Sequence, residues 1–447
     1  MYDVHVIETS SLGDRSYLAT DGAAAVVIDP QRDVDRVLAL AGRLGVRITA
    51  VAETHLHNDY VSGGLELSRL TGAAYAMAAG DEVAFERTPL TDGDVLEVSP
   101  TLRLKAMATP GHTFHHLSYV LEHEGAQVGV FTGGSLLFGT TGRPDLLGPE
   151  HTETLARHQH ASARRLADTL PDGARIWPTH GFGSFCAVGT PTGDDASTLA
   201  QEKLGNPALR LAKHAFVTEV LSGLGAYPAY YAHMGALNAA GPDPVDLRLP
   251  VLADPERLAA SIAAGEWVVD LRSRKAYAAA HLTGTVSLGL DGSMATWLGW
   301  LVDRGAPITL LGETREQVAT ARRELVRIGL DRPSAAVGAP QDLKGEVATL
   351  PTATFADLAA VHGDVVVLDV RQPDEHRASH VTGALNIPLP QLPARLGELP
   401  GGEIWVHCGS GYRAAAAASI LARDGKQAVL VDDLFANARA AGVPMTG

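Results

Sequence analysis

Two stretches of this sequence carry residues whose types and spacing are suited to chemistry. The first is a set of four histidines: His55 and His57 in THLHNDY, His112 in TPGHT and His180 in PTHG. Each follows a run typical of a strand, and loops at strand ends can bring ligands together on a rigid sheet. Imidazole nitrogen is a common ligand of zinc and iron. The pattern therefore predicts a shared metal site, with Asp59 as a further candidate for metal or substrate.

The second stretch is the loop CGSGYR, residues 408–413, which follows an apolar strand-like run and precedes an alanine-rich helical run. The helix N-terminus and the charge of Arg413 both stabilise a thiolate at Cys408. A thiolate attacks sulfur or phosphorus electrophiles. The alternative, a buried core cysteine, fits the small glycines and the adjacent arginine less well. The backbone N–H groups of the loop can hold an anion, including a persulfide; they belong to Gly409, Ser410, Gly411 and Tyr412.

The strands and helices that must position these residues follow a simple order. Up to about residue 190, short β runs such as AAAVVIDP alternate with helical stretches such as DVDRVLALAGRLG, and several runs end in His, Asp or Gly. Residues 194–240 are expected to be largely helical.

The C-terminal half contains an internal repeat, in which residues 267–290 match residues 365–389. Each copy has a β-rich run ending in Asp-x-Arg, a polar helical stretch, His-x-x-Gly and a second apolar strand. Strand alternating with helix predicts a parallel sheet with helices on both faces. Pro- and Gly-rich joints place two such domains at 250–345 and 350–447. The matching pairs, each 99 residues apart, are Asp270 and Asp369, Arg272 and Arg371, His281 and His380, and Gly284 and Gly383.

The histidine segments, together with FTGG and GRPD, resemble the metallo-β-lactamase fold, and most of all its persulfide dioxygenase branch, which shares the Gly-Arg-x-Asp element. The resemblance covers roughly residues 1–245 and implies an αββα sandwich with a helical C-terminal extension. Its site lies at one edge of the two sheets. A persulfide dioxygenase holds iron(II) with two histidines and a carboxylate.

Two positions depart from that pattern. Tyr60 stands where the family has a histidine, and Gly134 stands where it has the carboxylate ligand. Asp59 or Ser135 is left as a substitute, and an aspartate at position 134 should raise iron affinity if the pocket has room. The predicted ligands are therefore three histidines, which leave one position open and suit one iron(II) or zinc per chain, with an empty site as the alternative. They are His55, His57 and His112.

Arg143, in the GRPD element, has two interpretations. It either holds a substrate carboxylate in its planar guanidinium fork or forms a salt bridge to Asp145 across a tight turn. His180 is likewise a candidate for binding either metal or substrate.

The last segment resembles a rhodanese domain through Asp369-Val370-Arg371, the His380 to Pro388 segment and the Cys408 to Arg413 loop. That family moves sulfane sulfur through a cysteine persulfide, and a loop of six residues suits sulfur rather than phosphate. The middle copy has Gly312 in place of Cys408, so we expect an inactive rhodanese-like domain there.

The whole order resembles persulfide dioxygenase–rhodanese fusions: an α/β chain with a metallo-β-lactamase-like sandwich followed by two rhodanese-like doubly wound domains. The implied function is sulfurtransfer through Cys408, coupled to oxidation of a small-molecule persulfide. The alternatives are a zinc-dependent thioester-type hydrolase fused to a sulfur carrier, and a first domain that is not catalytic. Expected partners are a thiol persulfide or thiosulfate and further copies of the chain.

Composition agrees with a cytoplasmic enzyme. The chain of 447 residues has a net charge of −15, which disfavours nucleic acid and anionic membrane surfaces. Its two cysteines exclude a disulfide framework, and no apolar run is long enough to span a membrane.

Overall fold

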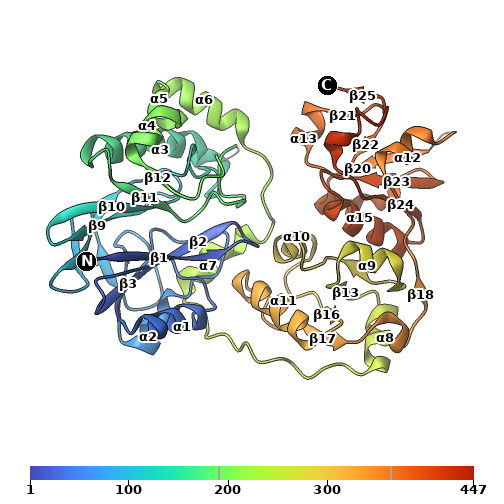
Figure 1. Ribbon diagram of the computed structural model, residues 1–447, viewed down its shortest axis with the longest axis horizontal. Coiled ribbons are helices and arrows are strands. Elements are labelled where there is room, and N and C mark those ends of the chain that lie inside the picture. Colours follow the sequence, from blue (N-terminus) through green and yellow to red (C-terminus); the bar gives the residue numbers. More distant parts are fainter. Residues whose placement is uncertain (190–191, 363–364) are drawn as a thin grey trace. The chain divides into compact units, whose positions relative to one another are not determined.

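The computed structural model describes residues 1–189, 192–362 and 365–447, which form two compact units (Figure 1). The first comprises Met1–Val245 with Val326–Gly329, and the second comprises Asp246–Leu325 with Leu330–Gly447.

The first unit contains two six-stranded sheets packed face to face. Strand β3 shows why: Val26 and Ile28 point into the core between the sheets, whereas Val27 faces the helices outside, so both faces of the strand are apolar. One sheet has the order β1 (Asp3–Thr9), β2 (Asp14–Thr20), β3 (Ala24–Ile28), β4 (Arg47–Ala52), β5 (Ala74–Ala78) and β6 (Thr88–Leu90). The other has the order β12 (Ser197–Thr198), β11 (Arg175–Pro178), β10 (Ala126–Gly133), β9 (Leu117–His123), β8 (Leu102–Ala108) and β7 (Val95–Glu97).

Helices cover the outer face of each sheet. Helices α1 (Asp35–Leu44) and α2 (Gly64–Thr71) bury Val37 and Leu67 against the first sheet. Helix α3 (Pro149–Thr169) buries Ala163 and Leu166 against the second sheet. The result is the αββα sandwich that the sequence predicts (Figure 1). The predicted helical extension contains α4 (Leu199–Gly205), α5 (Pro207–Arg210), α6 (Lys213–Gly223) and α7 (Tyr231–Ala240).

The second unit contains two parallel sheets, each with helices around it (Figure 1). The first has the order β15 (Val286–Ser287), β13 (Trp267–Asp270), β16 (Ile308–Gly312) and β17 (Ser334–Val337). The second has the order β19 (Thr352–Ala353), β24 (Gln427–Val431), β23 (Glu403–His407), β20 (Val366–Asp369) and β22 (Leu385–Asn386). Two short antiparallel pairs complete the strands: β14 (His281–Leu282) with β18 (Val347–Ala348), and β21 (His380–Val381) with β25 (Met445–Thr446).

Short helices connect the strands of these two sheets. The first sheet has α8 (Pro255–Ala263), α9 (Arg274–Ala279), α10 (Met294–Leu301), α11 (Arg315–Arg327) and η1 (Pro340–Asp342). The second has α12 (Phe355–Ala360), α13 (Pro373–Ala378), η2 (Leu389–Gln391), α14 (Leu392–Arg395), η3 (Leu396–Glu398), α15 (Tyr412–Arg423) and η4 (Phe435–Asn437). No helix in the described part of the chain is both long and apolar enough to cross a membrane.

The repeated Asp-x-Arg motif makes the same buried ion pair in both halves of the second unit. Arg272 donates to both carboxylate oxygens of Asp270 and also to the carbonyl of Ala280, at 2.8 Å. Arg371 donates in the same way to Asp369 and to the carbonyl of Ser379, at 2.7 Å. The motif therefore fixes the loop that follows the first strand of each copy.

Candidate functional site

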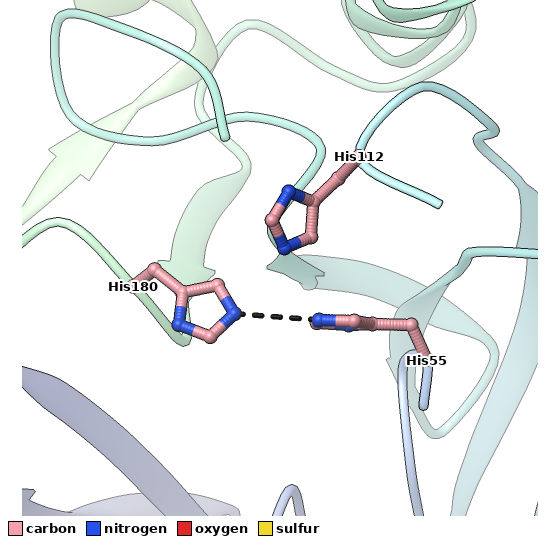
Figure 2. A group of neighbouring side chains, drawn as sticks. All are labelled: His55, His112 and His180. Atoms are coloured by element: carbon pink, nitrogen blue, oxygen red, sulfur yellow. Dashed lines mark hydrogen bonds between the residues drawn. The ribbon is translucent and has the colours of Figure 1, made fainter. Parts of the chain in front are cut away.

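Three of the predicted histidines meet in the first unit. His55 follows β4, His112 follows β8 and His180 follows β11, so each stands at the end of a strand. One nitrogen from each ring lies within 4.8 Å of the other two, and all three side chains are buried. Figure 2 shows the three rings pointing toward one another. The geometry therefore has the convergence that a metal site requires.

Hydrogen bonds fix which nitrogen each ring presents. The Nδ1 atom of His112 lies 2.7 Å from the carbonyl oxygen of Arg143, which can only accept, so Nδ1 carries the proton. The Nδ1 atom of His180 lies 2.9 Å from Asp14 Oδ1 and donates to that carboxylate. In both rings Nε2 therefore points into the site, and Nε2 of His112 is buried without a hydrogen-bond partner among the described residues.

His55 is oriented through a longer chain of hydrogen bonds. The hydroxyl of Thr54 donates to Asp29 Oδ2 at 2.7 Å, so its oxygen accepts from Nδ1 of His55 at 2.8 Å. Nε2 of His55 is left to face Nε2 of His180, 3.3 Å away. All three rings thus donate from Nδ1 to an oxygen and turn Nε2 inward, the usual arrangement of metal-ligating histidines.

This geometry fits a metal ion. Two nitrogens bound at 2.0–2.1 Å in a tetrahedral shell are about 3.3–3.4 Å apart, and Nε2 of His55 and Nε2 of His180 are 3.3 Å apart. Burial holds the pKa of His55 well below its usual range and lowers that of His112 to about 3, so both rings are neutral and have a lone pair to offer. The residues present therefore suit a bound divalent ion.

Carboxylates lie behind His180. Burial alone would lower the pKa of this ring, but Asp59 and Asp14 raise it to about 10. Asp59 Oδ2 lies 3.1 Å from Nδ1 of His180, so it stands behind the ring, on the same side as Asp14. A metal ion would take the place of the proton on Nε2, and the two carboxylates would hold the ring and increase its basicity.

His57 does not join the group formed by His55 and His112, although our sequence analysis predicted all three as ligands. Its Nε2 lies 3.1 Å from Glu53 Oε2 and 3.3 Å from Asp29 Oδ1. Tyr60 stacks on the ring with centroids 4.3 Å apart, and its hydroxyl lies 3.0 Å from the same nitrogen. Burial opposes the charge, but Asp29 and Glu53 raise the pKa of His57 to about 9.

His57 thus joins a buried ion-pair cluster through Nε2, while its Nδ1 is buried without a hydrogen-bond partner among the described residues and its ring centroid lies 4.1 Å from that of His55. The nitrogens that converge with those of His55 and His112 are those of His180. The phenol of Tyr60 packs against the His57 ring, with its hydroxyl beside the same nitrogen that the carboxylates contact. His57 also lies near Asp59 and His180, within 4.8 Å atom to atom, so it borders the site.

Arg143 is engaged within the protein. Its Nε and one terminal nitrogen donate to Asp145 at 2.6 and 2.8 Å, and the guanidinium also donates to the carbonyls of Phe185 and Gly225. It further stacks on Tyr227, 4.5 Å from the ring centroid. Of our two interpretations, the geometry matches the salt bridge to Asp145, and the carbonyl of Arg143 orients His112.

Sequence reasoning missed His116, Asp14 and Asp29. His116 stacks on His55 with centroids 5.0 Å apart, but its Nε2 accepts a hydrogen bond from the N–H of Gly134, so its lone pair is used. Asp29 lies at the end of the strand-like run AAAVVIDP, and this strand-end position could have marked it as a candidate site residue. No comparable signal marked Asp14, which reaches His180 across 166 residues of sequence.

The second candidate site is the loop at Cys408 in the second unit. Strand β23 leads into it and α15 begins at Tyr412, as the sequence predicts. The N–H of Gly411 donates to the sulfur of Cys408 at 3.1 Å, and the thiol is buried. Gly411 has φ of +93°, which favours glycine, and a Cβ atom there would collide with Asp432. The turn thus aims a donor at the sulfur.

Arg413 lies beside this loop and is paired. Its two terminal nitrogens donate to the two carboxylate oxygens of Glu375 at 2.6 and 2.8 Å, a partner that sequence reasoning missed. Burial opposes ionisation of Glu375, but Arg413 lowers its pKa. Gly409 and Tyr412 connect the loop to other segments by hydrogen bonds. The carbonyl of Gly409 accepts from the N–H of Phe435, and the Tyr412 hydroxyl donates to the carbonyl of Gly289. Ser410 is exposed.

Comparisons with known proteins match segments of both units. Residues 14–180 match the model of the metallo-beta-lactamase superfamily, and residues 354–436 match that of the rhodanese-like domain. Mitochondrial persulfide dioxygenase ETHE1 of Homo sapiens is 28% identical over 244 residues, which are 54% of this chain and 81% of that protein. A hydroxyacylglutathione hydrolase of Ectopseudomonas mendocina (strain ymp) is 33% identical over 157 residues, which are 35% of this chain and 56% of that protein.

A solved metallo-beta-lactamase structure from Staphylococcus aureus subsp. aureus COL is 28% identical with a TM-score of 0.67, and the match covers 75% of this chain and 99% of that one. The first unit is thus a domain of the metallo-β-lactamase superfamily. With the matched segment 354–436, the chain combines a metallo-β-lactamase domain related to ETHE1 with a rhodanese-like domain near its C-terminus.

Proposed function

We propose that this protein handles sulfane sulfur at two sites, by sulfur transfer through a persulfide of Cys408 and by metal-dependent chemistry on small-molecule persulfides in the first domain. The observation that carries the proposal is the contact between Cys408 and Gly411, where a backbone N–H meets a buried sulfur at the start of α15. A thiolate and the terminal sulfur of a persulfide are both anions that such a donor stabilises.

The transfer step balances with residues of this loop. The thiolate of Cys408 attacks the outer sulfur of thiosulfate, a new S–S bond forms, and the S–S bond of thiosulfate breaks with its electron pair leaving on sulfite. An acceptor thiolate or cyanide then takes the outer sulfur and returns Cys408 to a thiolate. Arg413 is held by Glu375, so its role is to keep the loop and its positive field in place.

The experiment for this site is sulfur transfer from thiosulfate, or from a small-molecule persulfide, to cyanide or a thiol. Cys408→Ser should abolish transfer. Cys186→Ser is the matched control, because Cys186 is the other cysteine, is also buried and lies in the first unit. Full transfer by Cys408→Ser would reject the assignment.

For the first domain we propose one metal ion per chain, held by Nε2 of His55, His112 and His180. Bound iron(II) would supply dioxygen chemistry toward a persulfide, whereas bound zinc would supply an activated water. The protein's own part is to hold the three rings from the Nδ1 side and to keep water out through burial. The relation to ETHE1, over most of that protein's length, supports the persulfide dioxygenase reading.

A zinc-dependent thioester hydrolase is the second candidate, supported by the similarity to hydroxyacylglutathione hydrolases. Elemental analysis of protein purified without added metal separates the candidates. Iron with oxygen uptake on persulfide supports dioxygenation, and zinc with thioester cleavage supports hydrolysis. A chain without metal supports a first domain that only binds a thiol.

We further propose domain limits of 1–245, 250–345 and 350–447, with an inactive rhodanese-like domain in the middle. The shared Asp-x-Arg ion pair supports a common fold for the last two. In the middle copy the side chain of Gln317 accepts hydrogen bonds from the N–H groups of Glu313 and Thr314, at 2.7 and 3.4 Å. Two of the backbone donors that could hold an anion are therefore already in use.

A further inference from the structure

The loop at Cys408 is contacted by residues of the middle copy of the repeat, residues 250–345, which contains no cysteine and is called the cysteine-free repeat below. Within the second unit, the Tyr412 hydroxyl donates to the carbonyl of Gly289 at 2.8 Å, and Trp297 lies under the Arg413 guanidinium, 5.6 Å from ring centroid to Cζ. Both partners come from the segment 250–345. One side of the sulfur site is therefore built by residues that the rhodanese-like match, 354–436, leaves out.

Arg274, at the start of α9, is the cation that this segment brings to the loop. Its Nε donates to Asp432 Oδ1 at 2.6 Å, and its Nη1 lies 3.6 Å from Asp291. A Cβ atom on Gly411 would lie 3.0 Å from Nε of Arg274. Arg274 thus packs on the residue whose N–H donates to the Cys408 sulfur.

The two arginines near the Cys408 sulfur differ in which of their guanidinium nitrogens already donate hydrogen bonds. Glu375 takes both terminal nitrogens of Arg413. Asp432 takes only Nε of Arg274, and Nη2 has no hydrogen-bond partner among the described residues, while 26% of the side chain is exposed. Burial alone would lower the pKa of Arg274, but Asp432, Asp291 and a thiolate at Cys408 raise it, so the charges are within electrostatic range.

We propose that Arg274 is a substrate-binding residue for the sulfur transfer at Cys408, and that its free guanidinium edge binds the anionic group of the sulfur donor, such as the sulfonate oxygens of thiosulfate. A guanidinium suits this role because its planar N–H groups match paired oxygens. This inference rests on the proposed function of Cys408. It gives the cysteine-free repeat a part in substrate recognition rather than a spacer's role.

The test compares Arg274→Gln and Arg274→Lys with Lys275→Gln, which removes the same charge one residue further along α9. Losing a charge-assisted contact to the donor should raise KM for thiosulfate by about ten-fold in Arg274→Gln and leave kcat within about two-fold. Arg274→Lys should lie between that variant and the unmodified protein, and Lys275→Gln should not differ from the latter. A fall in kcat at unchanged KM, or equal effects of Arg274→Gln and Lys275→Gln, would overturn the proposal.

A binding measurement separates this proposal from the proposed function. Calorimetric titration of thiosulfate into Cys408→Ser should give binding that weakens by about ten-fold in Cys408→Ser combined with Arg274→Gln. This readout requires no turnover, so it stands even if transfer is absent and the function of Cys408 is rejected. Equal affinities in the two proteins, or no binding to Cys408→Ser at all, would show that Arg274 does not hold the donor.

Discussion

The imidazole of His112 occupies the space that a side chain on Gly134 would need. A Cβ atom at position 134 would lie 2.3 Å from Cδ2 of His112 and 2.9 Å from its Nε2. On the other side of the ring, a Cβ atom on Gly142 would lie 2.8 Å from Nδ1. His112 is thus held between two glycines while Nδ1 donates to the carbonyl of Arg143. The pocket has no room for a carboxylate at position 134 while His112 keeps this position.

This contact changes the expected result of adding a carboxylate there. Gly134→Asp should weaken metal binding by about ten-fold or more, because it displaces His112 from the hydrogen bond that orients it. Gly134→Ala brings the same collision without a carboxylate and should behave alike. The measurement is metal affinity by competition with a chelator. If Gly134→Asp binds iron more tightly than the unmodified protein while Gly134→Ala does not, His112 has moved and the carboxylate has joined the ligands.

The ligand set is tested by comparing His180→Ala with His57→Ala. Loss of His180 should remove tight metal binding, because its Nε2 faces that of His55 at 3.3 Å. Loss of His57 should leave metal content near that of the unmodified protein. It should instead destabilise the fold by about 3–5 kcal/mol, since Asp29 and Glu53 lose their buried cation.

Metal content and urea unfolding of the metal-free proteins give the two readouts. If His57→Ala loses its metal and His180→Ala keeps it, the set predicted from sequence, with His57 as third ligand, is the correct one.

The fold was largely predictable because its signals are local. The continuous apolar run of β3 and the strand–helix order of the repeats specify layers and parallel sheets. Whether His57 or His180 converges with His55 and His112 was not predictable from the sequence, because it depends on side-chain packing. Tyr60, Asp29 and Glu53 contact Nε2 of His57, and Asp14, 166 residues away in the sequence, accepts a hydrogen bond from His180. The loop at Cys408 was predictable from its glycines, whereas Glu375 and Arg274 reach it from other elements.

The carboxylate behind His180 offers a test of orientation rather than ligation. Asp14→Asn keeps the size of the side chain but removes the negative charge that holds Nδ1 of His180 at 2.9 Å. Metal affinity should fall by about 10- to 100-fold, as is usual when such a partner of a ligating histidine is lost. Asp21→Asn, on the same unit but bonded to Ser99 and Thr101, is the control and should not alter affinity. Equal affinities for Asp14→Asn and the unmodified protein would mean that the carboxylate does not support the ligand.

The ion pair between Glu375 and Arg413 predicts a pH dependence of stability. Because the pKa of Glu375 is lowered in the folded state, the pair's stabilisation is present above the unfolded value of about 4.3. It is lost as the pH falls through the folded pKa. The Glu375 side chain is 35% exposed, so solvent screening limits the effect to about 1 kcal/mol at neutral pH. Urea unfolding of Glu375→Gln should differ from the unmodified protein at pH 7 and converge with it below about pH 4. A difference that stays constant across this range would show that the pair adds no stability.

The cysteine-free repeat should not gain transfer from a cysteine alone. In Cys408→Ser combined with Gly312→Cys, the new thiol would stand at the end of β16, but a Cβ atom there would lie 3.1 Å from the carbonyl oxygen of Thr314 and 3.2 Å from Gln317. Arg315 stands where Gly411 does, three residues after the sulfur position. The described non-glycine residues with positive φ are Asp29 and Glu124, so Arg315 does not make the turn that aims the N–H of Gly411 at sulfur. Gln317 also occupies the N–H groups of Glu313 and Thr314.

For the double variant we expect transfer no higher than in Cys408→Ser, measured with thiosulfate and cyanide, and cysteine alkylation would verify that the new thiol is reduced. Transfer restored to within about ten-fold of the unmodified protein would show that the loop geometry is not what activates Cys408.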